Sequence, residues 1–248
     1  LSFGNVDAGG VKEVLSVKRS YTNYLPNIHI NYDVADDKKL RLSYSTGISR
    51  PSYIEARAAS SIGIITQEIT GGNPFLKEEE SWGLDAAFEW YYNDASLFSV
   101  TVFMREIDNV ISESNSKVDG SLYSDTAQPG ELWDLAAFGN GKDGELQGIE
   151  ISINARLDNY IDGFFSGFGA SLNLALIESE YTTPEGQTFA LPGQSDTNYN
   201  ATIFYEDHGF TARLTYRYRS EWLDETETGA VFENCLLYTS DAADEASS

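Results

Sequence analysis

Hydrophobic and polar residues alternate along most of this chain. The clearest stretch places Trp82, Leu84 and Phe88 on one parity and Asp85 and Glu89 on the other. A period of two predicts a β-strand with one apolar face and one polar face.

The same alternation recurs along the chain, and no segment has a convincing 3.6-residue period. The expected strands cover residues 28–34, 40–46, 79–92, 96–108, 146–157, 168–176, 199–205 and 210–218. Short polar turns join these strands in pairs, and long loops at residues 50–78, 114–144 and 179–194 join the pairs. Loops of this length are uncommon in compact domains unless they serve a function. We therefore expect antiparallel hairpins, with tight turns at one end of the sheet and long loops at the other.

These two-faced strands suit a lipid bilayer. Each has roughly ten residues, which is the span of a tilted transmembrane strand, and aromatic residues gather near the strand ends. A soluble antiparallel sandwich also alternates, but it rarely keeps long and short connections in strict alternation. The predicted fold class is all-β: an antiparallel meander of about eight to ten strands, with lipid on the apolar face and water on the polar face.

Composition narrows the function classes. The net charge of −23 argues against nucleic-acid binding, because like charges repel a phosphate backbone. A single cysteine, Cys235, excludes an internal disulfide framework and a multi-cysteine metal site. No apolar run is long enough for a transmembrane helix, and no signal peptide is recognisable at Leu1, so we interpret the chain as a fragment.

No catalytic centre is evident in the sequence. The two histidines are His29, on a predicted polar strand face, and His208, in a tight turn. Neither has a serine or cysteine partner at a plausible spacing. The acidic loops lack the regularly spaced aspartates of a calcium-binding loop. We therefore expect no enzymatic activity, no metal site and no cofactor.

One stretch carries a family resemblance. It reads Arg50-Pro51-Ser52-Tyr53, then Gly72-Asn73-Pro74-Phe75-Leu76-Lys77-Glu78-Glu79-Glu80-Ser81-Trp82, and later Ile107-Asp108-Asn109 and Gly148-Ile149-Glu150. In this order, over residues 20–225, the pieces resemble the barrel domain of TonB-dependent outer-membrane receptors. Glu78 departs from the family pattern, which has proline there, and this affects only the expected local turn.

The resemblance implies a location and a function. The family barrel has 22 strands, so this chain would be an open segment from its C-terminal part. Such receptors lie in the Gram-negative outer membrane, in contact with lipid. They take up a scarce nutrient with energy from the inner-membrane TonB complex, transmitted through a plug domain that is missing here. A passive porin-like barrel or an adhesin is the alternative.

The end of the chain breaks the strand pattern. We assign residues 1–234 to the partial barrel and residues 235–248 to a non-native or disordered tail. The tail resembles translated sequencing-adapter read-through. A native acidic loop after Trp222 is the alternative.

Four aromatic residues in the expected loops are the candidates for ligand contact. They are Tyr123, Trp133, Tyr181 and Trp222. The loops are acidic, which repels an anionic ferric siderophore and suits a neutral saccharide, slightly preferred here, or a cation. The alternative is that these side chains only pack the loops together.

The strand parities predict which side chains face lipid and which face the barrel lumen. The lipid-facing set is Ile28, Ile30, Leu84, Phe88, Val100, Val102, Ile151, Ile153, Leu172, Leu174, Ile203, Leu214 and Tyr216. The lumen-facing set is Arg41, Asp85, Glu89, Arg105, Glu150, Arg156, Arg213 and Arg217.

Level strand ends also predict charge pairs on the lumen wall. They place Arg105 near Glu150, Arg219 near Asp196, and Arg217 near Asn198. Cross-strand pairs of this kind stiffen a sheet and fix its register. One alternative is that shear between strands shifts the register by two residues, so that Arg105 pairs with Glu145 or Ser152. The other is that each charge is simply hydrated.

Overall fold

The computed structural model describes residues 20, 22–93 and 95–223, except for the side chain of Asn159, together with the backbone of four short strands beyond these ranges. Those strands are β1 (Gly4–Asp7), β2 (Gly10–Val11), β17 (Val231–Phe232) and β18 (Leu237–Asp241). The predicted tail at residues 235–248 therefore lies outside the described residues, apart from the backbone of β18. Its assignment stays a prediction.

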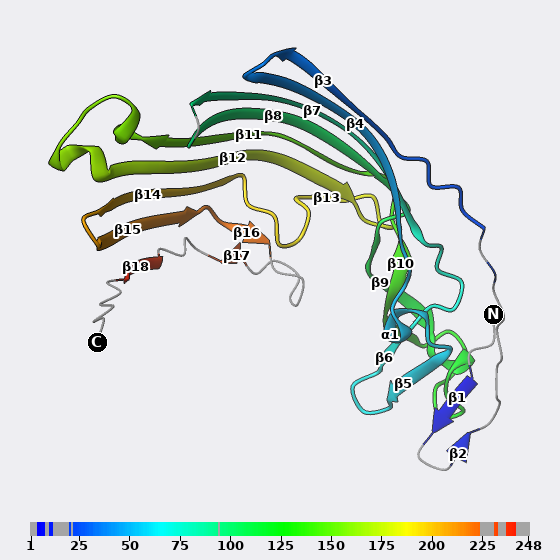
Figure 1. Cartoon of the computed structure of the whole chain (residues 1–248). Helices are drawn as coiled ribbons and strands as arrows, with labels where there is room; N and C mark the ends of the chain where they lie inside the picture. The colour runs from blue at the N-terminus through cyan, green and yellow to red at the C-terminus, as the bar shows by residue number, and fades with distance from the viewer. Residues whose placement is uncertain are drawn as a thin grey trace.

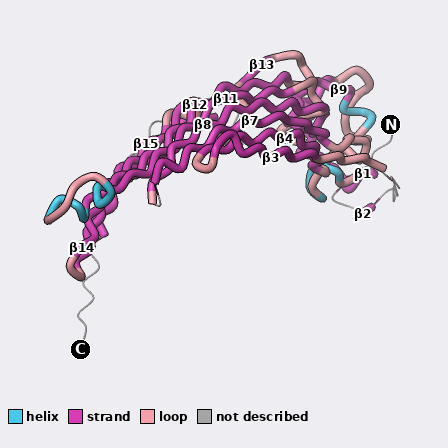
Figure 2. The backbone as a smooth tube through the Cα atoms, turned by 45° about the horizontal axis from the view of Figure 1, so that its top comes forward, coloured by secondary structure: helices cyan, strands magenta, loops and turns pink. Residues whose placement is uncertain are grey.

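Eight long strands form one open antiparallel sheet. They are β3 (Ile28–Ala35), β4 (Lys38–Ser49), β7 (Glu79–Asn93), β8 (Ser96–Asp108), β11 (Gly144–Arg156), β12 (Phe168–Thr182), β14 (Thr197–Asp207) and β15 (Phe210–Arg219). Each pairs with the next along the chain, so the sheet is a meander. It also includes β13 (Thr188–Phe189) beside β12, and β18 beside β15. Figure 1 shows the strands side by side in an arc, and Figure 2 shows them as a curved layer. The predicted all-β meander is confirmed.

The cross-strand register confirms the predicted faces. One row of opposed residues runs Leu42, Ala86, Val102, Ile149 and Leu176 across five strands. A second row, three residues away on each shared strand and so of opposite parity, runs Lys39, Glu89, Ser99, Ser152, Asn173, Asn200 and Arg217. Directly opposed residues point to the same side of a sheet. All side chains predicted to face lipid therefore share one face, and all those predicted to face the lumen share the other.

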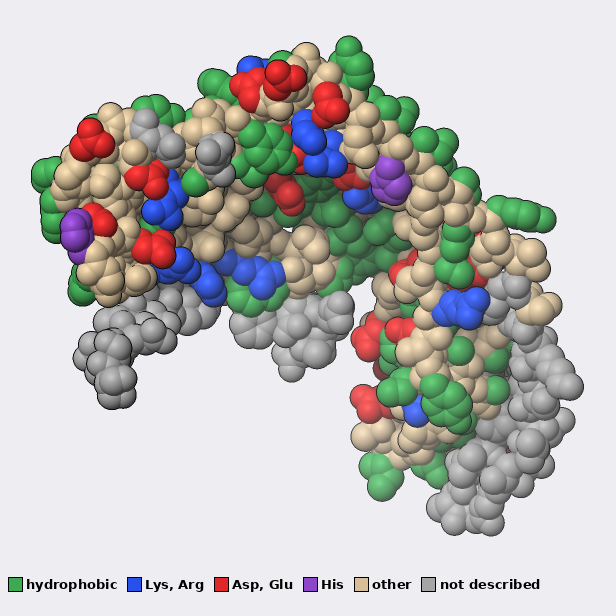
Figure 3. All heavy atoms as spheres, viewed as in Figure 1, with side chains coloured by type: hydrophobic (Ala, Val, Ile, Leu, Met, Phe, Trp, Pro, Cys, Tyr) green, Lys and Arg blue, Asp and Glu red, His purple; other side chains and the backbone are tan. Residues whose placement is uncertain are grey.

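The apolar face has no second layer over it in the described part of the chain. Ile28 is 57% exposed, Val102 49% and Ile203 58%. In Figure 3, hydrophobic side chains protrude along the outer rim of the arc. A soluble sandwich would cover this face with another sheet. No helix among the described residues is both long and apolar enough to cross a membrane.

The sequence pattern suggested that the first two long loops are irregular, but the structure shows strands in them. They contain β5 (Ala59–Gly63), β6 (Glu68–Gly71), β9 (Ile111–Asp119) and β10 (Leu132–Asn140), which form a second sheet with β1 and β2. Short helical turns flank these strands: α1 (Tyr53–Ala56) and η1 (Gly120–Leu122). The remaining elements are η2 (Leu157–Asn159), η3 (Phe164–Gly167) and β16 (Trp222–Leu223). We call the second sheet the loop sheet.

The loop sheet joins separate loops through parallel pairing. Strand β6 pairs with β10, with Ile69 opposite Leu135, and β1 pairs with β5. Ile69 and Trp133 are fully buried, and Tyr123 packs with them in a small core of the loop sheet. A Cβ atom on Gly120 would lie 2.7 Å from the Trp133 ring, so this close approach requires glycine. The two loops therefore form one packed unit.

Asp119 closes the segment between β9 and β10. Its Oδ1 accepts hydrogen bonds from the Ser121 hydroxyl at 2.7 Å and the Ser121 backbone at 3.0 Å, and its Oδ2 accepts one from the Gly130 backbone at 2.9 Å. The Ser121 hydroxyl, followed by the backbone N–H groups of Gly130 and Ser121, lowers the pKa of Asp119 below its ordinary value. Because the folded-state pKa is lowered, this stabilisation is present above the unfolded-state pKa and is lost as the pH falls through the folded-state pKa.

We predict that the loop sheet loosens in acid. Hydrogen-exchange protection of residues 119–131, corrected for intrinsic rates, should fall when the pH drops below about 4, where carboxyl groups protonate. Asp119→Asn should lower this protection already at pH 7 and reduce its pH dependence. The control is Glu68→Gln, an exposed carboxylate on β6. Equal protection of wild type and Asp119→Asn across the pH range would contradict this role.

Candidate ligand-binding surfaces

The loop end of the main sheet encloses a large hollow, which we call the vestibule. Its volume is about 1210 Å³. Four carboxylates line it, with one arginine, Arg50, and three aromatic side chains from the β10 and β12–β13 regions. The carboxylates are Glu55, Glu79, Glu113 and Glu185, and the aromatic residues are Phe138, Tyr181 and Phe189.

The family-like stretch builds one wall of the vestibule. Ser52 caps α1 in a reciprocal capping box: its hydroxyl accepts from the Glu55 backbone at 3.3 Å, and the Glu55 carboxylate accepts from the Ser52 backbone at 2.5 Å. The Asn73 backbone then donates to the Glu55 carbonyl at 2.6 Å. The Asn73 side chain donates to the Phe138 carbonyl at 3.0 Å and accepts from the Phe75 backbone at 2.9 Å. The asparagine of this motif therefore ties the first loop to β10.

Asn140, which the sequence did not single out, completes the attachment. Its side chain accepts from the Lys77 backbone at 2.8 Å and donates to the Lys77 carbonyl at 3.1 Å and the Asn109 carbonyl at 2.8 Å. Glu79 accepts from the Ile111 backbone at 2.8 Å. These contacts join residues far apart in the sequence, so no local pattern could have revealed them.

A hydrogen bond favours the charged form of one vestibule carboxylate, Glu185. The Ser114 hydroxyl donates to Glu185 at 2.6 Å and is the main reason that the pKa of this carboxyl lies below its ordinary value. Glu113 and Glu185 are both exposed at the hollow. An electronegative hollow attracts cations, accepts hydrogen bonds from neutral hydroxyl groups and repels anions.

The structure separates the four aromatic residues predicted to contact ligand. Trp133 is 2% exposed and Tyr123 is 9% exposed, and both lie in the core of the loop sheet. Buried side chains offer no surface to a ligand, so these two are packing residues, as the alternative interpretation expected. Tyr181 lines the vestibule and packs against Phe189, with ring centroids 6.2 Å apart. Trp222 lies at a different hollow.

That second hollow lies mainly along the polar face of β11, β12, β14 and β15. Its volume is about 570 Å³. Ser152, Asn173, Asn200 and Arg217 face one another in register across the four strands, and Ser152 donates to Asn173 at 2.9 Å. At its edge, the Arg219 guanidinium lies 4.1 Å from the Trp222 ring centroid. We call it the wall hollow; its polar side chains include three asparagine amides, the carboxylate of Glu150, and two arginines on β15.

The predicted pair of Arg105 with Glu150 is wrong. The two residues lie on neighbouring strands and on the same face, but Arg105 is opposite Leu146, four residues away. Arg105 instead binds Asp85 on its other neighbour, β7, at 2.8 Å. The prediction assumed level strand ends at residues 96 and 158. Strand β11 stops earlier, at Arg156, because residues 157–159 turn into η2.

The predicted pairs across the β14–β15 turn are displaced by two residues. Arg219 lies opposite Asn198, not Asp196, and Arg217 lies opposite Asn200. The cause is the turn, whose two central residues, His208 and Gly209, have φ values of 52° and 76°. Positive φ at both positions marks a two-residue hairpin turn. It closes with Asp207 opposite Phe210, which sets the register of the whole hairpin.

Other pairs hold the polar face together. Arg41 binds Glu89 at 2.7 Å, and Ser43 donates to Asp85 at 2.7 Å, so Asp85 joins β4, β7 and β8. Arg219 donates to the Ser195 hydroxyl at 2.8 Å. The idea that polar pairs tie neighbouring strands thus applies to partners other than those predicted.

The described residues show no group of three or more histidine, cysteine, aspartate or glutamate side chains arranged to hold a metal ion. His208 contacts Asp207 at 2.8 Å in its turn, and His29 lies on β3. Neither histidine lines the vestibule or the wall hollow.

Similarity to known proteins agrees with this architecture. A family model described as "TonB dependent receptor-like, beta-barrel" matches residues 2–241. Among solved structures, the ferric enterobactin receptor PfeA from Pseudomonas aeruginosa is similar, with a TM-score of 0.65, 16% identity, and coverage of 86% of this chain and 31% of that chain. The siderophore receptor PirA from Acinetobacter baumannii has a TM-score of 0.57 and 14% identity, with coverage of 86% of this chain and 33% of that chain. The copper transporter OprC has a TM-score of 0.57 and 16% identity, with coverage of 86% of this chain and 30% of that chain.

At these identities the structural likeness shows the fold alone. This chain spans only about a third of the length of these solved chains, at 31%, 33% and 30%. No curated protein sequence matches the chain significantly. The family model, however, matches nearly the whole sequence, and this chain therefore belongs to the TonB-dependent receptor-like β-barrel family.

Proposed function

We propose that this chain forms part of the wall of an outer-membrane receptor that imports a small nutrient with energy from the inner-membrane TonB complex. The energy would reach the barrel through a plug domain. The family groups transport receptors rather than enzymes. No observation favours the porin-like or adhesin alternative.

The exposed apolar face of the main sheet carries this proposal. Its side chains lie in register across all eight long strands and remain open, as at Ile28 and Ile203. In a bilayer this surface would contact acyl chains, while the polar face would line the lumen. Lipid cannot satisfy an open strand edge, so the ends of the sheet need further strands to close a barrel. A Gram-negative outer membrane is the corresponding location.

The vestibule favours a neutral or cationic ligand over an anionic chelate. Four carboxylates and one arginine line it, and Glu185 holds its charge through Ser114. Tyr181 and Phe189 add aromatic surface. The similar solved proteins are named as siderophore receptors and a copper transporter, and none is named for a saccharide. The initial preference for a saccharide therefore has no support from these comparisons, and the ligand class rests on charge alone.

We predict that the intact receptor binds a neutral oligosaccharide or the cationic complex hexamminecobalt(III), and not an anionic ferric catecholate chelate. Isothermal titration calorimetry with these three probes tests this. The double variant Glu113→Gln/Glu185→Gln should weaken binding of the trivalent cationic probe at least fivefold, since one carboxylate and a single unit charge already interact by about 0.5 kcal/mol at about 8 Å in water. The matched control is Asp36→Asn/Asp162→Asn, which removes two charges at the opposite end of the sheet. Binding of the anionic chelate alone would contradict the ligand class.

The energy source is tested separately in cells. Uptake of the compound that binds should stop in cells that lack TonB, although surface binding remains. The control is the same strain with TonB restored. Uptake at the same rate without TonB would show a passive barrel.

A further inference from the structure

The connection between β11 and β12 differs from the other short connections at the same end of the sheet. The others are polar turns at Asp36–Asp37, around residue 95 and at His208–Gly209. Residues 157–167 instead form two helical turns, η2 and η3, which we call the turn lobe (Figure 1). Three of its aromatic side chains are largely exposed: Tyr160 at 63%, Phe164 at 64% and Phe165 at 63%. A polar turn would have closed this hairpin without exposing any aromatic surface.

The turn lobe continues the apolar face of the main sheet. The Phe164 ring lies 5.0 Å from Tyr205 and 6.2 Å from Phe168, measured between centroids, and Phe165 lies 6.3 Å from Phe168. Phe168 is opposite Tyr205, two positions from the pair of Ala170 with Ile203. Phe168 and Tyr205 therefore point to the same side as the apolar face. The exposed rings extend that face past the ends of the strands.

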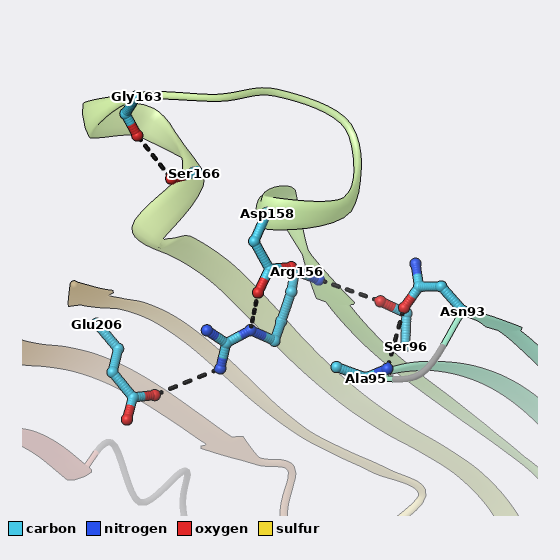
Figure 4. A network of polar contacts seen from close by, with 8 residues as sticks. All are labelled: Asn93, Ala95, Ser96, Arg156, Asp158, Gly163, Ser166 and Glu206. Carbon is cyan, nitrogen blue, oxygen red and sulfur yellow. Dashed lines mark hydrogen bonds and ion pairs between the residues drawn. The ribbon is translucent and has the colours of Figure 1, made fainter.

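The other side of the turn lobe is polar and fixed (Figure 4). The Arg156 guanidinium binds Asp158 at 3.0 Å and reaches Glu206 on β14 at 3.4 Å. The Arg156 backbone donates to the Ser96 hydroxyl at 3.2 Å, and Ser96 is only 3% exposed. Arg156, the last residue of β11, thus connects Asp158 of the lobe to β8 and β14. These contacts therefore fix the position of the segment that carries the aromatic rings.

Two features within the lobe shape it. Gly163 has φ 86°, a left-handed conformation that favours glycine, and it starts η3. The Ser166 backbone and hydroxyl both donate to the Gly163 carbonyl, at 2.9 Å and 2.6 Å.

The Asn93 side chain donates to the Tyr160 hydroxyl at 3.4 Å. Tyr160 therefore has its apolar ring exposed while its hydroxyl contacts a polar group, an arrangement that suits an interface between lipid and water.

We propose that the turn lobe is an interfacial membrane anchor, in which Phe164, Phe165 and Tyr160 insert at the boundary between the headgroups and acyl chains of the leaflet on the tight-turn side. The proposal rests on the proposed function, because it requires lipid on the apolar face. Continuity with that face favours lipid over a second copy or another protein as the occupant. The polar residues in and beside the lobe include three carboxylates, Asp158, Asp162 and Glu206, and one arginine, Arg156, so a zwitterionic headgroup fits better than an anionic one. Aromatic side chains favour this depth of a bilayer.

Spin labels in the intact receptor test this anchor. Every cysteine of the intact receptor, including Cys235 where it is present, is replaced by serine, and single cysteines are introduced by Phe165→Cys, Leu214→Cys or His208→Cys. The labelled receptor is placed in phosphatidylcholine vesicles, and the accessibility of each label to oxygen and to a water-soluble nickel chelate is measured. Leu214 lies on the apolar face and serves as the lipid reference, while His208 is 83% exposed in a polar turn and serves as the water reference.

The label at position 165 should show a ratio of oxygen to nickel accessibility several-fold higher than the label at 208, although lower than the label at 214. A ratio at 165 equal to that at 208, with 214 in lipid, would overturn the anchor and leave the proposed function intact. Exclusion of both reagents at 165, with 214 in lipid, would indicate that protein covers the lobe, and would also overturn the anchor. Nickel access at 214 would overturn the proposed function, and the anchor with it.

Discussion

The in-register antiparallel ladder of the eight long strands is the constraint on which the other features depend. Side-chain direction in a strand has a period of two, so slipping any strand by one residue would turn its charges toward the apolar face. Arg41 with Glu89, and Asp85 with Ser43 and Arg105, tie neighbouring strands on the polar face and oppose such a slip. The tight turn at His208–Gly209 fixes the last hairpin in the same way.

The two ends of this ladder are built for different surroundings. At the loop end, Asn73 and Asn140 attach the loop sheet to the family-like stretch, and the attached loops enclose an acidic vestibule. At the tight-turn end, Arg156 holds a lobe whose aromatic rings continue the apolar face. Under the proposed function, the chain thus presents carboxylates where a solute would arrive and aromatic rings where the lipid would end. Both features are held by polar contacts between residues distant in the sequence.

The sequence was sufficient to predict the eight long strands and their faces, because alternation is local and does not depend on partners. The register was not predictable to the residue, since it depends on where each turn closes: β11 ends at Arg156, and the last hairpin closes at Asp207 and Phe210. The loop sheet escaped prediction because its parallel pairing, such as Ile69 with Leu135, joins separate loops. The sequence did not reveal that Trp133 and Tyr123 are buried, because an aromatic residue in a loop has the same sequence signal whether it is buried or exposed. Tyr181 does line the vestibule.

The central claim is that one face of this sheet contacts lipid and the other contacts water. The adjacent residues Val102 and Thr101 point to opposite faces, so they test it most directly. Val102 lies opposite Ala86 and Ile149, while Thr101 lies opposite Ala87 and Glu150. The measurement is the free energy of unfolding of the intact receptor in phospholipid vesicles, from guanidinium titration. Val102→Arg should lower it by about 2–4 kcal/mol, as expected for arginine at the middle of a lipid-facing strand. Thr101→Arg should change it by less than about 1 kcal/mol, as at a hydrated surface position. Equal losses for the two variants, or a larger loss for Thr101→Arg, would contradict the account.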